Sequence, residues 1–127
     1  MRPPRLLVLD DEPEIGRLFQ KVAEGLGFEM RTAQDVATFR EIQRSFAADV
    51  VVLDLVIPER DGIELLRVLA AEGCHAQVLM MSGYDAKLLE AARRLGEAWG
   101  LTMSGVITKP FRAADLQAVL QDVKDQM

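Results

Sequence analysis

Five polar residues that suit phosphoryl chemistry stand at the ends of four short apolar runs in this sequence. Asp10 and Asp11 follow the first run, and Asp54, Ser82 and Lys109 follow the other three. If these runs are parallel β-strands, their carboxyl ends share one edge of the sheet, so the five side chains meet despite their separation in sequence. The sequence therefore predicts one site with three carboxylates, a hydroxyl and an ammonium group.

The chemistry of such a site follows from its charges. Three carboxylates in one pocket repel each other and need a compensating cation unless they are protonated. Mg²⁺ prefers oxygen ligands and is typically held by one or two carboxylates together with phosphate oxygens. Asp54 is the best candidate nucleophile, because a carboxylate that attacks phosphorus gives an aspartyl phosphate. Asp10 and Asp11 would hold the metal ion, while Lys109 and Ser82 would contact the phosphoryl oxygens.

The runs that carry these residues have the composition of β-strands. Residues 6–9, 50–53 and 78–81 are unbroken apolar segments, which is typical of strands covered on both faces. Residues 28–32 instead alternate between apolar and polar side chains, the pattern of a half-exposed strand, and residues 106–107 form a short apolar run. We therefore expect the first three segments in the centre of a sheet and the last two at its edges.

Helical patterns separate the strands. Apolar residues recur at three- and four-residue steps in five segments, residues 15–26, 36–46, 65–69, 88–99 and 116–123. Gly27 supplies the left-handed backbone that commonly ends a helix. The alternation predicts an α/β fold, a doubly wound five-stranded parallel sheet of flavodoxin-like order 2-1-3-4-5 with five helices. This order places the ends of strands one, three, four and five side by side.

The composition is that of a single domain. The chain has 127 residues, half of them hydrophobic, so we assign residues 1–127 to one domain with one core. A formal net charge of -5 argues against direct contact with nucleic acid or an anionic membrane. The single cysteine, Cys74, excludes an internal disulfide and suits a reducing cytoplasm. No apolar stretch approaches membrane-spanning length.

Four segments together resemble the receiver domain of two-component response regulators. Their joint occurrence in this order, each at a predicted strand end, carries the resemblance, which extends over a core of about residues 5–123. The segments are residues 6–13 (LLVLDDEP), 52–58 (VLDLVIP) followed by Asp61 and Gly62, 81–83 (MSG) and 108–111 (TKPF).

The resemblance implies a role for each residue of the predicted site. Asp54 becomes the phosphoacceptor, and Asp10, Asp11, Asp54 and the backbone carbonyl of Val56 become the ligands of Mg²⁺.

The same resemblance makes Ser82 and Lys109 the pair that contacts the phosphoryl group, and it implies a cis peptide bond between Lys109 and Pro110.

A receiver of this kind is a signalling phosphoacceptor that catalyses only its own phosphorylation and dephosphorylation. Its implied partner is a sensor histidine kinase or a phosphotransfer protein in the cytoplasm. The implied outputs are a homodimer through the face of the fourth helix, fifth strand and fifth helix, or contact with an output domain or partner protein. The sequence leaves open whether the chain acts by itself or belongs to a longer regulator.

Three features depart from the usual receiver pattern. Val106 stands where receivers usually carry a tyrosine or phenylalanine, and a valine cannot make the ring movement that accompanies switching. The segment from Ser82 to Lys109 is longer than usual, with the extra length expected near residues 94–101. Tyr84 and Val56 would flank the phosphoryl group and hinder attacking water, which predicts a long-lived phosphorylated form.

Other classes of protein remain as alternatives. A receiver-like platform for binding or dimerisation that works without phosphorylation is compatible with Val106. A phosphatase with its nucleophile at Asp10 would need a second acid two residues later, which Glu12 satisfies only loosely. A flavin or nucleotide binder is disfavoured, because its first strand-to-helix turn should be rich in glycine or hydroxyl residues and here reads DDEP.

Overall fold

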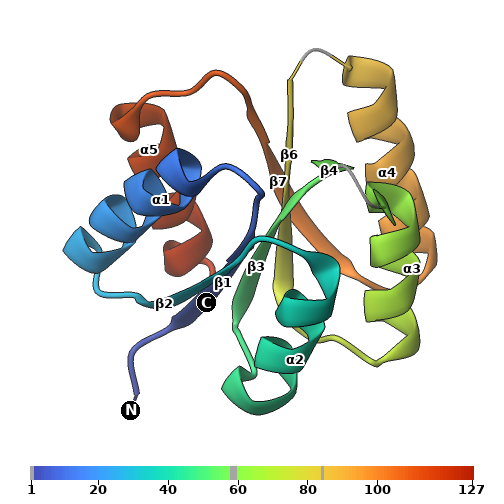
Figure 1. Ribbon diagram of the computed structural model, residues 1–127, viewed down its shortest axis with the longest axis horizontal. Helices are drawn as coiled ribbons and strands as arrows, with labels where there is room; N and C mark the ends of the chain where they lie inside the picture. The colour runs from blue at the N-terminus through green and yellow to red at the C-terminus, as the bar shows by residue number, and fades with distance from the viewer. Residues whose placement is uncertain (1, 58–59, 84) are drawn as a thin grey trace.

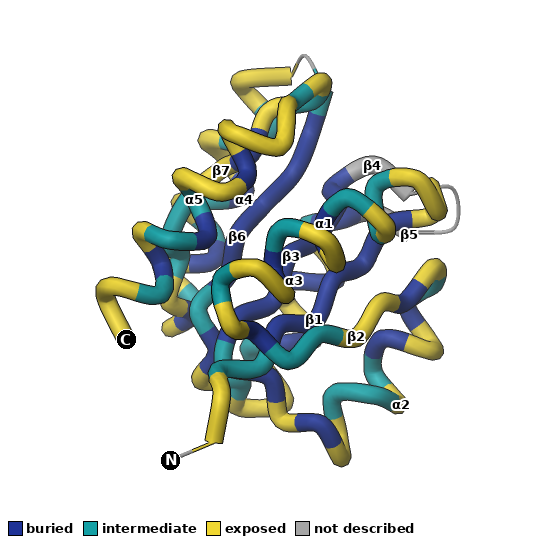
Figure 2. The backbone as a smooth tube through the Cα atoms, turned by 90° about the vertical axis from the view of Figure 1, so that its left-hand side faces the viewer, coloured by how far each residue is buried: buried dark blue, intermediate teal, exposed yellow. Residues whose placement is uncertain are grey.

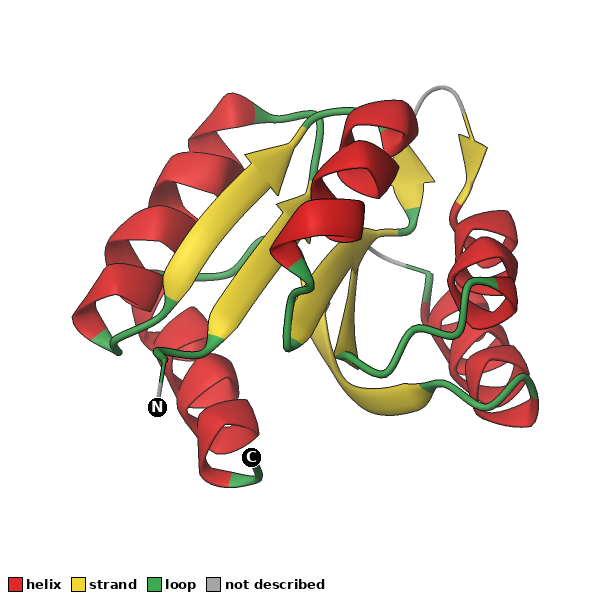
Figure 3. Ribbon diagram, turned by 90° about the horizontal axis from the view of Figure 1, so that it is seen from below, coloured by secondary structure: helices red, strands yellow, loops and turns green. Residues whose placement is uncertain are grey.

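The protein folds around a five-stranded parallel sheet with helices on both faces (Figures 1 and 3). The computed structural model describes residues 2–57, 60–83 and 85–127. Its elements are β1 (Arg5–Leu9), α1 (Pro13–Gly25), β2 (Glu29–Ala33), α2 (Val36–Phe46), β3 (Val50–Asp54), β4 (Val56–Ile57), β5 (Arg60–Asp61), α3 (Gly62–Ala71), β6 (Gln77–Ser82), α4 (Ala86–Ala98), β7 (Thr102–Thr108) and α5 (Ala113–Asp125).

The order of the strands in the main sheet is β2-β1-β3-β6-β7, and every neighbouring pair is parallel. Counted along the chain without the small antiparallel β4–β5 hairpin, this is the predicted order 2-1-3-4-5, so the flavodoxin-like prediction is confirmed. The hairpin itself was not part of the prediction, because two-residue strands leave no periodic pattern to read.

Burial follows the predicted division into central and edge strands. In β1, β3 and β6 all residues are buried except the first of β1 and of β6, whereas β2 and β7 are mostly half-buried or exposed. Figure 2 shows the central strands as the buried interior, with exposed backbone concentrated on helices and turns. A parallel strand covered by helices on both faces can be apolar along its interior, and in the central strands the polar residues stand only at the strand ends.

Two apolar layers hold the helices against the sheet. Alternate residues of β1 belong to different layers, because successive side chains of a strand point to opposite faces. Leu6 and Val8 pack with residues of α1 and α5, whereas Leu7 and Leu9 pack with residues of α2, α3 and α4. Each face of the sheet is therefore packed against helices, which holds the strands in place.

The strands extend further than their apolar runs. Asp54 and Ser82 are the last residues of β3 and β6, because their backbones still pair with the neighbouring strands. Strand β7 covers seven residues instead of the two-residue run at 106–107, and its register shifts so that Met103 and Gly105 face consecutive residues of β6. Ser104 is the extra residue of this bulge, and the extra length expected near residues 94–101 stays a prediction.

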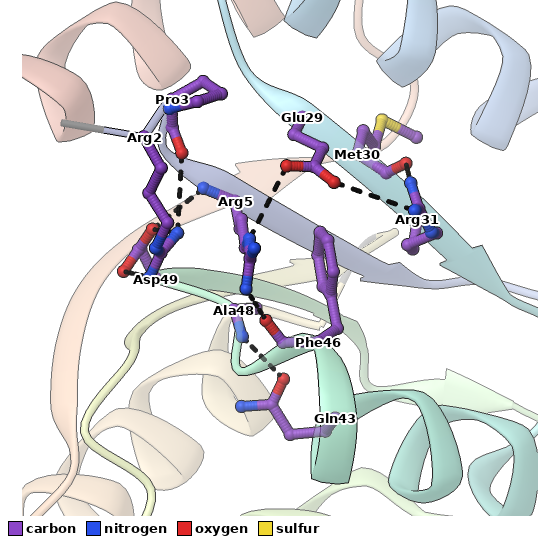
Figure 4. A network of polar contacts seen from close by, with 10 residues as sticks. All are labelled: Arg2, Pro3, Arg5, Glu29, Met30, Arg31, Gln43, Phe46, Ala48 and Asp49. Carbon is purple, nitrogen blue, oxygen red and sulfur yellow. Dashed lines mark hydrogen bonds and ion pairs between the residues drawn. The ribbon is translucent and has the colours of Figure 1, made fainter.

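A polar network fastens the opposite end of the sheet (Figure 4). The Asp49 carboxylate accepts the backbone N–H of Arg5 at 2.9 Å and two hydrogen bonds from the Arg2 guanidinium. Arg5 also donates to the carbonyl of Phe46 at 2.8 Å, and the guanidinium groups of Arg5 and Arg31 lie over the Phe46 ring. These contacts join the start of β1 to the end of α2, at the end of the sheet opposite the predicted site.

Gly62, the first residue of α3, lies against the chain that follows β3. A Cβ atom at Gly62 would stand 2.6 Å from the Cα and 2.8 Å from the carbonyl oxygen of Leu55. Because backbone atoms cannot move aside as a flexible side chain can, we expect Gly62→Ala to lower the free energy of unfolding by about 2 kcal/mol. Urea unfolding followed by circular dichroism measures this loss.

The matched control is Gly25→Ala at the end of α1, where an added Cβ meets nothing within 4 Å. This control should keep or slightly raise stability, by at most about 1 kcal/mol, because alanine favours helix. If Gly62→Ala were as stable as the unchanged protein, the close approach of Leu55 would not constrain this turn.

Candidate functional site

The carboxyl edge of the sheet, toward the top of Figure 1, collects the ends of β1, β3, β6 and β7. Backbone hydrogen bonds continue past the strands at this edge. The N–H of Asp10 donates to the carbonyl of Ala33 at 3.1 Å, and the N–H of Lys109 donates to the carbonyl of Ser82 at 2.9 Å. The residues that were predicted to react are thus held by the sheet itself, which gives them well-defined positions.

Lys109 gathers carboxylates from two other strand ends. Its Nζ lies 2.9 Å from Asp10 Oδ2, 3.0 Å from Asp54 Oδ2 and 3.2 Å from Glu12 Oε1. The side chains of Asp10 and Asp54 are 1% and 4% exposed, whereas that of Glu12 is 60% exposed. The structure therefore brings Asp10, Asp54 and Lys109 together at the floor of the site, with Glu12 at its rim.

The surroundings of Asp10 disfavour its ionised form. Its Oδ1 accepts the backbone N–H of Glu12 at 2.8 Å. Its Oδ2 is fully buried, and no hydrogen bond of good geometry reaches it from the described part of the chain, although Lys109 Nζ lies at ion-pair distance. Burial raises the pKa of Asp10; the Lys109 ammonium and the Glu12 N–H oppose this rise, and the charge of Asp54 adds to it.

Lys109 responds to the same surroundings in the opposite sense. Burial lowers the pKa of the ammonium, but its interactions with Asp10 and Asp54 outweigh burial and hold the pKa above its usual value. Lys109 therefore keeps its positive charge throughout the neutral pH range, and it is the cation that balances the buried carboxylates.

The site also offers oxygen donors for a metal ion. Asp10, Asp11 and Glu12 each present a carboxylate oxygen, and these oxygens lie within 4.8 Å of one another. Asp10 is buried at the base, while the other two are exposed to solvent. Clustered carboxylates, one of them with a buried oxygen that lacks a hydrogen bond, fit a hard divalent cation such as Mg²⁺.

The structure describes only some of the remaining predicted residues. Ser82 is 2% exposed at the end of β6, next to Lys109 through the backbone bond described above. Val56 pairs with Asp61 in the β4–β5 hairpin that follows Asp54, and its carbonyl as a metal ligand stays a prediction. Tyr84 lies outside the described residues. The Lys109–Pro110 peptide bond is cis, as the resemblance implied.

Glu12 is the site residue that the sequence reasoning missed, since it considered this acid only for a phosphatase. Its carboxylate both approaches Lys109 and belongs to the acidic group. The available signal was a glutamate at the N-cap of α1, directly before Pro13 at the first helical turn. N-cap positions favour Ser, Thr, Asp and Asn, so a glutamate there points to another use of the side chain.

Comparison with known proteins identifies the family. The chain belongs to the response regulator receiver domain family, which it matches over residues 6–121. It is 32% identical over 112 residues to the probable transcriptional regulatory protein TcrX of Mycobacterium tuberculosis, covering 87% of this chain and 45% of TcrX. It is 31% identical over 114 residues to the alkaline phosphatase synthesis transcriptional regulatory protein PhoP of Bacillus subtilis, covering 90% and 45%. The chain thus spans less than half of either relative.

Solved structures agree with this assignment. NtrX from Brucella abortus superposes with a TM-score of 0.84 at 28% identity, covering 99% of this chain and 28% of NtrX. A response regulator from Colwellia psychrerythraea gives a TM-score of 0.78 at 27% identity, covering 98% of each chain. A receiver domain from Pseudomonas fluorescens Pf-5, at 22% identity and a TM-score of 0.84, supports the fold alone.

Family membership narrows the function. Receivers are the signalling domains of two-component systems, typically Mg²⁺-dependent, and they work with histidine kinases. They are phosphoacceptors rather than enzymes with an external substrate, which favours this class over the phosphatase and the flavin binder. None of the helices in the described part of the chain has the length and apolar composition needed to cross a membrane.

The raised pKa of Asp10 has a consequence for stability. Because folding raises this pKa, ionised Asp10 lowers the free energy of unfolding at neutral pH, and the loss disappears as the pH falls through the folded-state pKa. We expect Asp10→Asn, without divalent cations, to stabilise the protein by about 1 kcal/mol near neutral pH. The gain should shrink as the pH falls toward the ordinary range of an aspartate, because the raised pKa of folded Asp10 means that this carboxylate is protonated before that range is reached.

Urea unfolding in the presence of a chelator, repeated across this pH range, measures the effect. Asp122→Asn on the exposed surface of α5 is the matched control and should change little. A gain at Asp10 that stays constant with pH would show that burial of its charge is not the cause.

Proposed function

We propose that this chain is a phosphorylation switch of a two-component phosphorelay, in which Asp54 accepts a phosphoryl group from a sensor histidine kinase or a phosphotransfer protein in the cytoplasm. The observation that carries the proposal is the buried Asp54 carboxylate at the end of a central strand, with one oxygen 3.0 Å from Lys109. A nucleophile in this position is shielded from most solvent and lies beside a fixed positive charge.

The transfer balances in simple terms. A carboxylate oxygen of Asp54 forms a bond to phosphorus, and the bond from phosphorus to the donor histidine nitrogen breaks, with its electron pair returning to that nitrogen. Lys109 already lies against Asp54, so its ammonium can move from the carboxylate to an oxygen of the transferred group. The Ser82 hydroxyl, at the end of the adjacent strand, is a second donor for these oxygens.

The acidic residues complete the charge balance. Asp10, Asp11, Asp54 and the Val56 carbonyl are the residues that would hold Mg²⁺, with Glu12 close by. When bound, Mg²⁺ supplies a positive charge that neutralises the incoming phosphoryl oxygens. In the metal-free protein the Lys109 ammonium lies against both Asp10 and Asp54. It does not fully offset the burial of Asp10, because the pKa of Asp10 is still raised.

The output of the switch would be a change in protein contacts. The face formed by α4, β7 and α5 carries Val106, which is 37% exposed on an edge strand. This face is the candidate surface for a homodimer, an output domain or a partner protein. Because valine has no ring to move, a response of this face would use another group or a displacement of the backbone of β7 or of its helices.

Intact mass spectrometry after incubation with acetyl phosphate and Mg²⁺ tests the proposal. We expect a single phosphoryl adduct on the unchanged protein and on Asp122→Asn, and its loss in Asp54→Asn or with a chelator. The physical reason is that the buried Asp54 carboxylate ends the central strand β3 and lies 3.0 Å from Lys109, whereas Asp10, which is also buried beside Lys109, is assigned to the metal ion in this proposal.

The opposite outcome has a definite meaning. If no adduct forms under conditions that label a known receiver, Asp54 is not a phosphoacceptor, and the phosphorylation-independent platform becomes the better description. Metal-independent binding of a partner would then be the next property to measure.

The lifetime of the adduct tests the predicted role of Tyr84. A bulky residue two positions after Ser82 should hinder water that attacks the phosphoryl group, so we expect Tyr84→Ala to lose its adduct several times faster than the unchanged protein. Time-resolved intact mass after removal of acetyl phosphate measures the two rates. Equal rates would exclude this shielding.

A further inference from the structure

Glu12 occupies a helix N-cap but does not act as a capping side chain. Its backbone is extended at the start of α1, and its side chain makes no cap hydrogen bond. The backbone N–H of Glu12 instead binds the Asp10 carboxylate, which holds this residue directly over the floor of the site. Its carboxylate reaches Lys109 at 3.2 Å, across 97 residues of sequence. The Glu12 side chain therefore contacts Lys109 in the site instead of capping the helix.

The same carboxylate has a second set of neighbours. It offers one oxygen that lies within 4.8 Å of a carboxylate oxygen of Asp10 and of Asp11, the residues that suit a divalent cation. A divalent cation in this group and the Lys109 ammonium would compete for the carboxylates of Asp10 and Glu12, because the two cations repel each other and each would draw on the same negative charge. Glu12 would therefore be shared between the two cations, and so would Asp10.

We propose that Glu12 is a positioning residue for Lys109, holding the ammonium over Asp10 and Asp54 in the metal-free protein and exchanging it for the divalent cation when that cation binds. This inference rests on the proposed function, since Lys109 has to leave its carboxylate partners to contact a phosphoryl oxygen. Binding of the cation and release of Lys109 are then coupled through one side chain at the rim of the site.

The exposure of Glu12 separates this role from a structural one. An ion pair whose carboxylate is 60% exposed contributes little to stability, so Glu12→Gln should fold and melt like the unchanged protein. Glu14, also exposed in the first turn of α1, provides a matched control, because Glu14→Gln removes the same charge from the same helix end. Any general effect of helix charge on the site appears in both variants.

Two measurements that need no phosphorylation test the exchange. Isothermal titration with Mg²⁺ should show about fivefold or more weaker binding for Glu12→Gln, and a change of less than about twofold for Glu14→Gln. A brief pulse of acetic anhydride, read by peptide mass spectrometry, reports how tightly the Lys109 amine is held. Without metal, Lys109 should be acylated faster in Glu12→Gln than in either other protein, and Mg²⁺ should increase its acylation most in the unchanged protein.

Equal Mg²⁺ affinity for the two variants, or metal-free acylation of Lys109 that is the same in all three proteins, would overturn the role of Glu12. Such a result does not contradict the proposed phosphorylation of Asp54, because Asp54 is retained in every variant. Conversely, failure of the unchanged protein to form that adduct overturns the proposed function, while the titration and the acylation experiment still report on Glu12 and Lys109.

Discussion

Balancing two buried carboxylates with one ammonium is the constraint on which this site depends. The side chains of Asp10 and Asp54 are almost fully buried, and Lys109 Nζ lies 2.9 Å from Asp10 Oδ2 and 3.0 Å from Asp54 Oδ2. Ion pairing of this kind offsets the loss of hydration only in part, as the raised pKa of Asp10 records. The charge of Lys109 therefore does not balance the carboxylates of the site, and the acidic residues at its rim extend the negative charge toward solvent.

The sheet makes this unfavourable arrangement possible. Strands β1, β3 and β6 are buried between two apolar layers, and their backbone pairing continues up to the reactive residues. At the other end of the sheet, Asp49 fastens the start of β1 through Arg2 and Arg5. Stability is thus concentrated in the core and at the amino edge, while the carboxyl edge carries the charges that function requires.

Family membership and geometry answer different questions. The receiver match identifies the class of protein, and the high TM-scores show that the backbone follows that class closely. The contact between Glu12 and Lys109 is a property of this chain, read from its own distances. The exposure of Val106 on β7 is likewise read from this chain alone.

The sequence by itself determined the existence of the strands of the main sheet and of the helices, their order in the sheet and the edge at which the polar residues meet, because periodic burial leaves a periodic pattern of apolar residues. The alternation in β2 was enough to place it at an edge. Only the tertiary structure decided that Lys109 faces Asp10, Asp54 and Glu12 at once, that a bulge lengthens β7, and that Leu55 lies against Gly62. These features depend on distances between segments far apart in the chain, and hydrophobic periodicity records how deeply each residue is buried but not which residue it meets.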